Sequence, residues 1–131
     1  MKEKELENWI FNLSQTPQGR RKLGECDLRS ILEEPMKQQV SLGGYGIIDL
    51  LQEDEDMFVG IELKTRNIKV EDIIQCCRYY EALSSYKTTY IHLIVPKSGF
   101  FESDLRYVVF NLKFLRVQEY TIKPEHIIFN S

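Results

Sequence analysis

The segment from Gly43 to Asn67 reads GGYGIIDLLQEDEDMFVGIELKTRN, and it decides the fold. Two β-rich runs, GIIDLL and MFVGIEL, flank the acidic sequence QEDED, a pattern that predicts a β-hairpin. Both strands carry charged residues where an apolar interior is expected: Asp49 in the first, and Glu62 and Lys64 in the second. A buried charge is costly unless it is paired or binds a metal, so these three residues require an explanation.

Apolar spacing on both sides of the hairpin predicts helices and further strands. Before the hairpin we predict helices over residues 4–13 and 24–34, the second ended by Pro35, and a strand over residues 37–42. After it we predict a helix over residues 70–83, a buried strand over 88–96, a helix from about Ser103 with Ser103 or Asp104 as its cap, and a strand over 114–122. Residues 123–131 have no clear pattern. This order is typical of an α/β fold in which helices cover both faces of a mixed central sheet.

Two features of the core also follow from the pattern. We expect the helix over residues 70–83 to pack on the sheet through Ile73, Ile74 and Cys77. His92 lies within an apolar strand, which favours a hydrogen-bonded core histidine over a ligand or a base. Three cysteines without a C-x-x-C motif predict free thiols rather than a zinc site.

Length, composition and charge limit the class of protein. The chain has 131 residues, of which 43% are hydrophobic and 28% charged, and these values predict one soluble domain. We divide it into N-terminal helices (1–35), a core sheet and helix (36–96), and a C-terminal helix and strand (97–131). A charged start and short apolar runs predict a cytoplasmic location and no membrane span. The net charge of −3 argues against a protein that mainly coats nucleic acid, but not against a nucleic-acid enzyme.

The charged residues of the hairpin form a chemically specific set. Alternation along a strand places Glu62 and Lys64 on one face, and Asp49 lies across the hairpin at about 5 to 8 Å. Two carboxylates, with the backbone carbonyl of Leu63, are ligands that suit Mg²⁺ or Mn²⁺. The Lys64 ammonium can orient a water or stabilise charge on a phosphate. The pattern therefore predicts metal-dependent hydrolysis of phosphodiester bonds.

The same residues resemble the core motif of the PD-(D/E)XK nuclease superfamily, in which one strand carries Asp and the next Glu-x-Lys. GIIDLL and VGIELKTR are most similar to the pattern of archaeal NucS-type endonucleases, and Holliday-junction resolvases share this core. The following helix contains QCCRY, from Gln75 to Tyr79, which resembles the Q-x-x-x-Y motif of RecB-like nucleases. The resemblance implies a restriction-endonuclease-like fold.

The resemblance also implies roles for individual residues. The metal ligands are Asp49 and Glu62, with the Leu63 carbonyl; the catalytic residues include Lys64 and Gln75; the candidate substrate-binding residues are Arg66 and Tyr79. Many members add a glutamate from a helix that precedes the sheet. Glu25 is the first candidate for it, and Glu33 and Glu34 remain open.

The implied activity is a Mg²⁺- or Mn²⁺-dependent deoxyribonuclease, in particular an endonuclease. The small domain predicts a homodimer on DNA, or a partner protein that supplies specificity, with the sequences HIIFN and GFF as candidate contacts. The alternative is a nuclease-fold module without useful catalysis, which binds DNA or assembles with a partner subunit.

Overall fold

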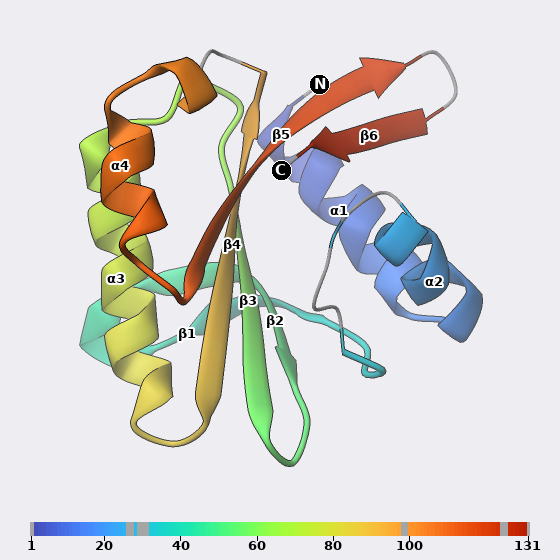
Figure 1. The fold of residues 1–131 in the computed structure, drawn as a ribbon. Coiled ribbons are helices and arrows are strands. Elements are labelled where there is room, and N and C mark those ends of the chain that lie inside the picture. Colours follow the sequence, from blue (N-terminus) through green and yellow to red (C-terminus); the bar gives the residue numbers. More distant parts are fainter. Residues whose placement is uncertain (1, 26–27, 29–31, 98–99, 124–125, 131) are drawn as a thin grey trace.

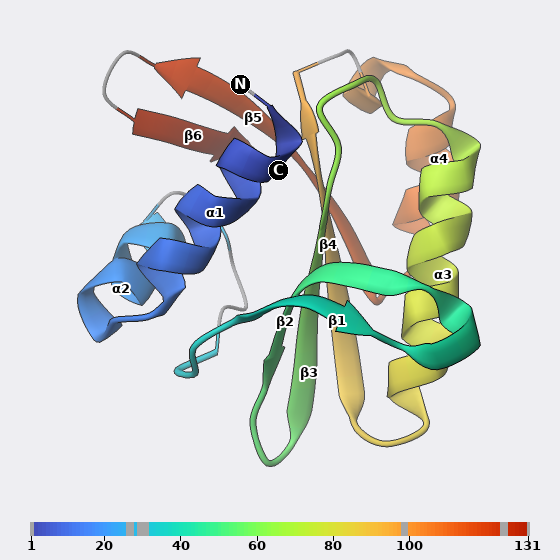
Figure 2. The ribbon, with the colours of Figure 1, turned by 180° about the vertical axis from the view of Figure 1, so that it is seen from behind.

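The structure is a computed structural model that describes residues 2–25, 28, 32–97, 100–123 and 126–130. Its centre is a six-stranded mixed sheet whose strands follow the order of the chain: β1 (Lys37–Ser41), β2 (Ile47–Glu53), β3 (Met57–Leu63), β4 (Thr88–Pro96), β5 (Leu115–Lys123) and β6 (His126–Asn130). The helices are α1 (Glu3–Ser14), α2 (Pro17–Glu25), α3 (Val70–Ser84) and α4 (Leu105–Phe110). Figures 1 and 2 show α3 and α4 over one face of the sheet, and α1 with α2 on the other. The predicted α/β class and mixed sheet are confirmed.

The hairpin predicted from the acidic turn is formed by β2 and β3. The two strands run antiparallel, with Leu50 opposite Ile61, and the N–H of Asp54 donates to the carbonyl of Met57 at 3.0 Å in the turn. From β3 the chain crosses through α3 to β4, which runs parallel to β3. Both β3 and β4 cover the predicted runs.

The outer strands complete the mixed sheet. β1 pairs antiparallel with β2, and β5 pairs parallel with β4. Buried His92 of β4 is held by Gln118 of β5, with 2.7 Å between Nδ1 and Oε1, as expected for a core histidine. The unassigned tail contains β6, which pairs antiparallel with β5 and forms one edge of the sheet.

Helix α3 packs on the sheet with a face that differs from the prediction. Its buried side chains are Asp72, Ile73, Cys76, Tyr79 and Leu83. Cys77 is half-buried, but Ile74 is 53% exposed, so the prediction for Ile74 was wrong. The side chains of adjacent residues on a helix point about 100° apart. Ile73 lies on the same face as the buried residues one and two turns further along α3, and Ile74 lies to the side of that face.

The predicted helix over residues 24–34 was also wrong. Helix α2 ends at Glu25, and residues 28 and 32–35 are not helical. Pro17 begins α2, because the first turn of a helix needs no N–H donor. Thr16 Oγ1 accepts the N–H of Gly19 at 3.0 Å, as the capping residue of a helix does. The sequence SQTPQG therefore ends α1 at Ser14, and it also starts a second helix that the pattern did not predict at this position.

Leu32 and Glu34, which lie between α2 and β1, are bound by a side chain of the sheet. Buried Gln52 of β2 accepts the N–H of Leu32 at 3.0 Å and donates to the Leu32 carbonyl at 3.0 Å. These backbone groups are thus satisfied by β2, and the chain bends at Glu33 and Glu34 before it enters β1. Ile31 lies outside the described residues.

The C-terminal helix begins close to the predicted position. A 3₁₀ turn, η2 (Phe100–Glu102), precedes α4. Ser103 Oγ donates back to the Phe100 carbonyl at 2.7 Å, and Asp104 stands at the N-cap without a side-chain capping bond to the described chain. Phe100 is only 1% exposed, which corrects its assignment to a dimer contact. No helix within the described ranges is both long and apolar enough to cross a membrane.

The two faces of the sheet bury separate cores, and this division sets the direction of Glu62. Ile61 and Leu63 of β3 belong to the core that also holds Leu6 and Ile10 of α1. Because side chains alternate along a strand, Glu62 between them points to the opposite face, toward α3.

Candidate functional site

The predicted acidic residues meet where β2 parts from β3. Residues 50–53 of β2 pair with β3, whereas Ile47 and Ile48 pair with β1. Asp49 lies just beyond the last pair with β3, and its Oδ2 accepts the N–H of Leu63 at 2.8 Å. The carboxylate therefore takes the place of the next backbone hydrogen bond and is fixed beside the end of β3.

Glu62 is the most buried of the charged residues predicted for the site on the hairpin. Its side chain is 6% exposed, and its Oε2 lies 3.5 Å from Lys64 Nζ. The hydroxyl oxygen of Tyr79 lies 3.3 Å from the same oxygen. Within the described part of the chain, Glu62 Oε1 has no hydrogen-bond partner. A buried carboxylate oxygen without a partner is destabilising, and it is a group that a cation can bind.

Burial and a second carboxylate perturb the titration of Glu62. Desolvation is the largest cause and the negative charge of Asp49 the next, and together they raise the pKa of Glu62 from 4.5 to about 8, although the Lys64 charge lowers it. Glu62 thus holds a proton at neutral pH. The structure brings Asp49, Glu62 and Lys64 together, as the sequence pattern predicts.

Side chains of α3 hold the loop that enters β2. The loop consists of η1 (Gly43–Tyr45) and Gly46. Three side-chain donors from α3 bind two carbonyls of this loop and the carbonyl of Ile47, the first residue of β2. The pairs are Gln75 Nε2 to Tyr45 O at 2.8 Å, Arg78 Nη2 to Gly44 O at 3.0 Å, and the Tyr79 hydroxyl to Ile47 O at 2.8 Å. Gln75 therefore acts on the loop in this structure, and Tyr79 joins the loop to Glu62. Desolvation raises the pKa of Tyr79 well above its usual range, so its hydroxyl keeps the proton that it donates.

The Gly46→Ala substitution tests this loop contact. Gly46 has φ +113°, and an added Cβ would lie 3.0 Å from Gln75 Nε2. We expect the variant to lose about 1 to 3 kcal/mol of unfolding free energy in urea denaturation, the usual cost of such backbone strain. Gly44→Ala is the control, because a Cβ there meets nothing within 4 Å. Equal losses in the two variants would contradict a specific role for Gly46.

The third acid predicted for this site lies elsewhere. Glu25 is exposed at the end of α2, and Glu33 and Glu34 are exposed before β1. The structure instead brings Glu3 and Glu7 of α1 toward the site. Burial, followed by the charge of Asp49, raises the pKa of Glu3. Glu7 is 2% exposed, and the side chain of Gln39 in β1 joins it to Asp49. Glutamates four apart on α1 were the available signal in the sequence.

Arg66, a predicted substrate-binding residue, forms a salt bridge that fixes the start of α3. Its two terminal nitrogens donate to the two oxygens of Asp72, each at 2.8 Å. Asp72 Oδ2 also accepts the N–H of Lys69 at 2.8 Å. Burial raises the pKa of Asp72, but these hydrogen bonds outweigh it and bring the pKa below its usual value. The Arg66 side chain is still 45% exposed, so one side of the guanidinium faces solvent.

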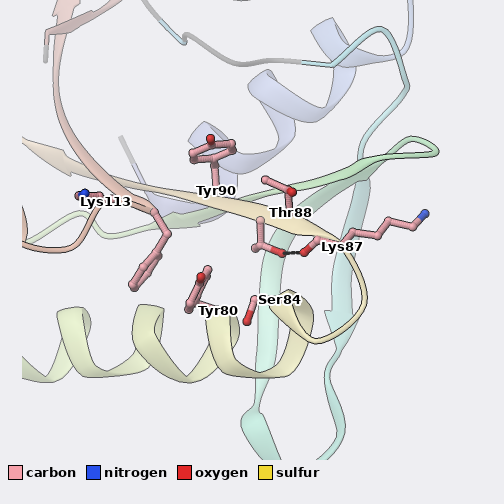
Figure 3. Close-up of a pocket in the computed structure, with 8 residues that line it drawn as sticks. Tyr80, Ser84, Lys87, Thr88, Tyr90 and Lys113 are labelled. Carbon is pink, nitrogen blue, oxygen red and sulfur yellow. Dashed lines mark hydrogen bonds between the residues drawn. The ribbon is translucent and has the colours of Figure 1, made fainter.

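A cavity of about 370 Å³ lies at the other end of the sheet (Figure 3). It is lined by Tyr80, Ser84, Lys87, Thr88, Thr89, Tyr90, Lys113 and Phe114. Thr88 pairs with Met57 at the beginning of β3, so the cavity is a strand length away from Glu62. The Lys87 ammonium is bound to Glu53 at 2.7 Å, and in Figure 3 this side chain extends away from the other residues. The cavity is separate from the carboxylate site.

The acidic site is built from two carboxylates. Among the described residues, no three His, Cys, Asp or Glu side chains come together in an arrangement that could hold a metal ion. Comparisons with models of known families, with curated proteins and with solved structures gave no match. Any assignment of function therefore rests on the motif and on the geometry of Asp49, Glu62 and Lys64.

Proposed function

We propose that the protein is a Mg²⁺- or Mn²⁺-dependent deoxyribonuclease with the restriction-endonuclease-like fold that its motif resembles. The main support is Glu62 Oε1, a buried carboxylate oxygen that lacks a hydrogen-bond partner among the described residues and lies beside Asp49 and Lys64. The topology agrees with this fold, because an antiparallel hairpin bearing Asp and Glu-x-Lys is followed by a helix and a parallel strand.

The residues present fit a hard divalent cation. Asp49 and Glu62 offer oxygen ligands, and Mg²⁺ commonly binds through one or two carboxylates while it keeps several waters. The N–H of Leu63 donates to Asp49, and the carbonyl of Leu63 remains the predicted third ligand of the cation. When bound, the ion would neutralise charge on the phosphodiester and lower the pKa of a bound water.

The neighbouring side chains prepare the site for this chemistry. Lys64 is 24% exposed and reaches Glu62, so its ammonium lies between the buried carboxylate and solvent, where a phosphate can approach. Tyr79 holds Glu62 from the side of α3. Basic residues near the start of the helix and on its surface, Lys69 and Arg78, are exposed and can contact the DNA backbone. A homodimer remains a prediction.

Cleavage of supercoiled plasmid under different metal conditions tests the proposal. We expect nicked and linear products with Mg²⁺ or Mn²⁺, and none with EDTA. Ca²⁺ should allow DNA binding but little cleavage, because its longer and looser coordination positions a water poorly. Asp49→Asn should abolish cleavage, whereas Asp56→Asn, an exposed carboxylate of the hairpin turn, should leave it unchanged.

Two results would contradict the proposal. Cleavage that persists in EDTA would show that the activity does not depend on a divalent metal. Cleavage by the Asp49→Asn variant at the wild-type rate would show that it comes from another site. Mn²⁺ binding without cleavage of any DNA substrate would favour the alternative, a nuclease-fold module that assembles with a partner.

A further inference from the structure

Gln39 of β1 has an unusual backbone conformation. Its φ is +50°, and within the described residues it is the only non-glycine residue with a positive φ. Its neighbours Gln38 and Val40 pair regularly with Leu50 and Ile48 of β2, so the register continues through this position and places Gln39 opposite Asp49. Positive φ is uncommon for a residue with a long side chain, and such strain concentrates at functional sites.

The conformation of Gln39 turns two successive side chains toward one carboxylate. In a regular strand Gln38 and Gln39 would point to opposite faces of the sheet. Here Gln38 Nε2 donates to Glu7 Oε2 at 2.7 Å, and Gln39 Nε2 donates to Glu7 Oε1 at 2.6 Å. The positive φ of Gln39 accounts for this common direction.

Gln39 also binds Asp49, whereas Gln38 binds a residue of α1 instead. Gln39 Nε2 donates to Asp49 Oδ1 at 3.1 Å, so the two N–H groups of this amide join Glu7 to Asp49. The other oxygen of Asp49 is held by the N–H of Leu63. Both oxygens of Asp49 are therefore oriented by donors, one from each neighbouring strand. Gln38 instead donates its second bond to Asn8 of α1, at 2.9 Å.

We propose that Gln39 is a positioning residue, which uses the buried carboxylate of α1 as an anchor to fix the orientation of Asp49 for cation binding. This inference rests on the proposed function, because it concerns the same metal site. The N–H of Leu63 holds only one oxygen of Asp49, so the carboxylate could otherwise rotate about that contact. The Gln39 amide opposes this rotation with a donor that is itself fixed by Glu7.

A comparison of Gln39→Gly with Gln38→Ala tests the inference. Glycine adopts positive φ without strain, so Gln39→Gly removes the amide and spares the backbone. We expect it to weaken Mn²⁺ binding by about tenfold or more in calorimetric titration, the scale of losing an outer-shell partner of a metal ligand. Gln38→Ala is matched, since it also removes a bond to Glu7 but none to Asp49. Its Mn²⁺ affinity should stay within about twofold of wild type.

Thermal unfolding and the Asp49→Asn variant complete the design. The metal-free unfolding temperature of Gln39→Gly should be no lower than that of Gln38→Ala, so weaker Mn²⁺ binding cannot be ascribed to loss of structure. Wild-type affinity in Gln39→Gly, or equal weakening in both glutamine variants, would overturn the role of Gln39 and leave the metal site standing. If wild type binds no Mn²⁺, or Asp49→Asn binds it equally well, the metal site fails and this inference fails with it.

Discussion

Lys64→Ala should lower the rate of plasmid cleavage by about a hundredfold or more, the scale of losing one electrostatic stabiliser of a transition state. The Lys64 ammonium lies 3.5 Å from Glu62 and is partly exposed, so it can reach a phosphate oxygen or an attacking water. Charge at that position grows during the reaction, and the effect should therefore fall on the rate more than on Mn²⁺ affinity. The Lys64 charge also lowers the pKa of Glu62, so the variant will hold the Glu62 proton more tightly.

The measurement must separate this proton effect from catalysis. Mn²⁺ titration and cleavage by wild type and variant are best compared at pH 9, above the pKa of about 8 for Glu62 in the wild type. Lys113→Ala removes one positive charge from an exposed position and should cleave at nearly the wild-type rate. An unchanged cleavage rate in Lys64→Ala would exclude Lys64 from the chemistry. A rate that falls equally in Lys113→Ala would indicate general attraction of DNA.

The central strands could be predicted from the sequence because their signals are local. MFVGIEL and TTYIHLIVP are continuous β-rich runs with clear boundaries, and β3 and β4 span them. The period of the apolar residues changes at Val70, where α3 begins. The same locality explains why Glu62 and Lys64 could be placed on one face, and Asp49 opposite them across a short turn.

Helix α2 could not be placed because the meaning of Pro17 and Gly19 depends on their surroundings. Proline and glycine after an apolar pattern indicate the end of a helix, as at Ser14, but a threonine before proline is also a helix start. Gly19 lies where α2 meets α1, and a Cβ there would fall 1.8 Å from the Leu13 carbonyl oxygen. Glycine is therefore required by a contact between helices, which no periodic pattern reveals.

The outer part of the site was missed for a related reason. Glu7 and Gln39 are 32 residues apart in sequence, and Gln39 can join Glu7 to Asp49 only because α1 lies beside β1 in the fold. Sequence order favours an acid in the helix predicted directly before the sheet, and Glu25 is the first candidate there. Neither the contact between α1 and β1 nor the positive φ of Gln39 can be recognised from a local pattern in the sequence.

Glu62→Gln should change stability and metal binding in opposite directions. In the unfolded chain Glu62 ionises near pH 4.5, whereas in the fold its pKa is about 8. Between these values the folded wild type binds a proton that the unfolded chain has lost, so Glu62 lowers the stability of the wild type by about 1.4 kcal/mol for each pH unit of rise. This contribution is absent below pH 4.5 and levels off above about pH 8. Glutamine does not titrate, so the stability gain of the variant should grow across the same window.

The cation should reverse this order, because the carboxylate that destabilises the metal-free fold is the one that holds the ion. Glu62→Gln should lose cleavage and detectable Mn²⁺ binding, and millimolar Mn²⁺ at pH 8 should raise the unfolding temperature of wild type but not that of the variant. Urea denaturation from pH 5 to 9, with and without Mn²⁺, measures both effects. Glu55→Gln, at an exposed position of the hairpin turn, controls for the loss of one carboxylate. A variant whose stability relative to wild type is the same at pH 5 and pH 8 would show that Glu62 is not protonated in the fold. A variant that Mn²⁺ still stabilises would show that the ion binds without it.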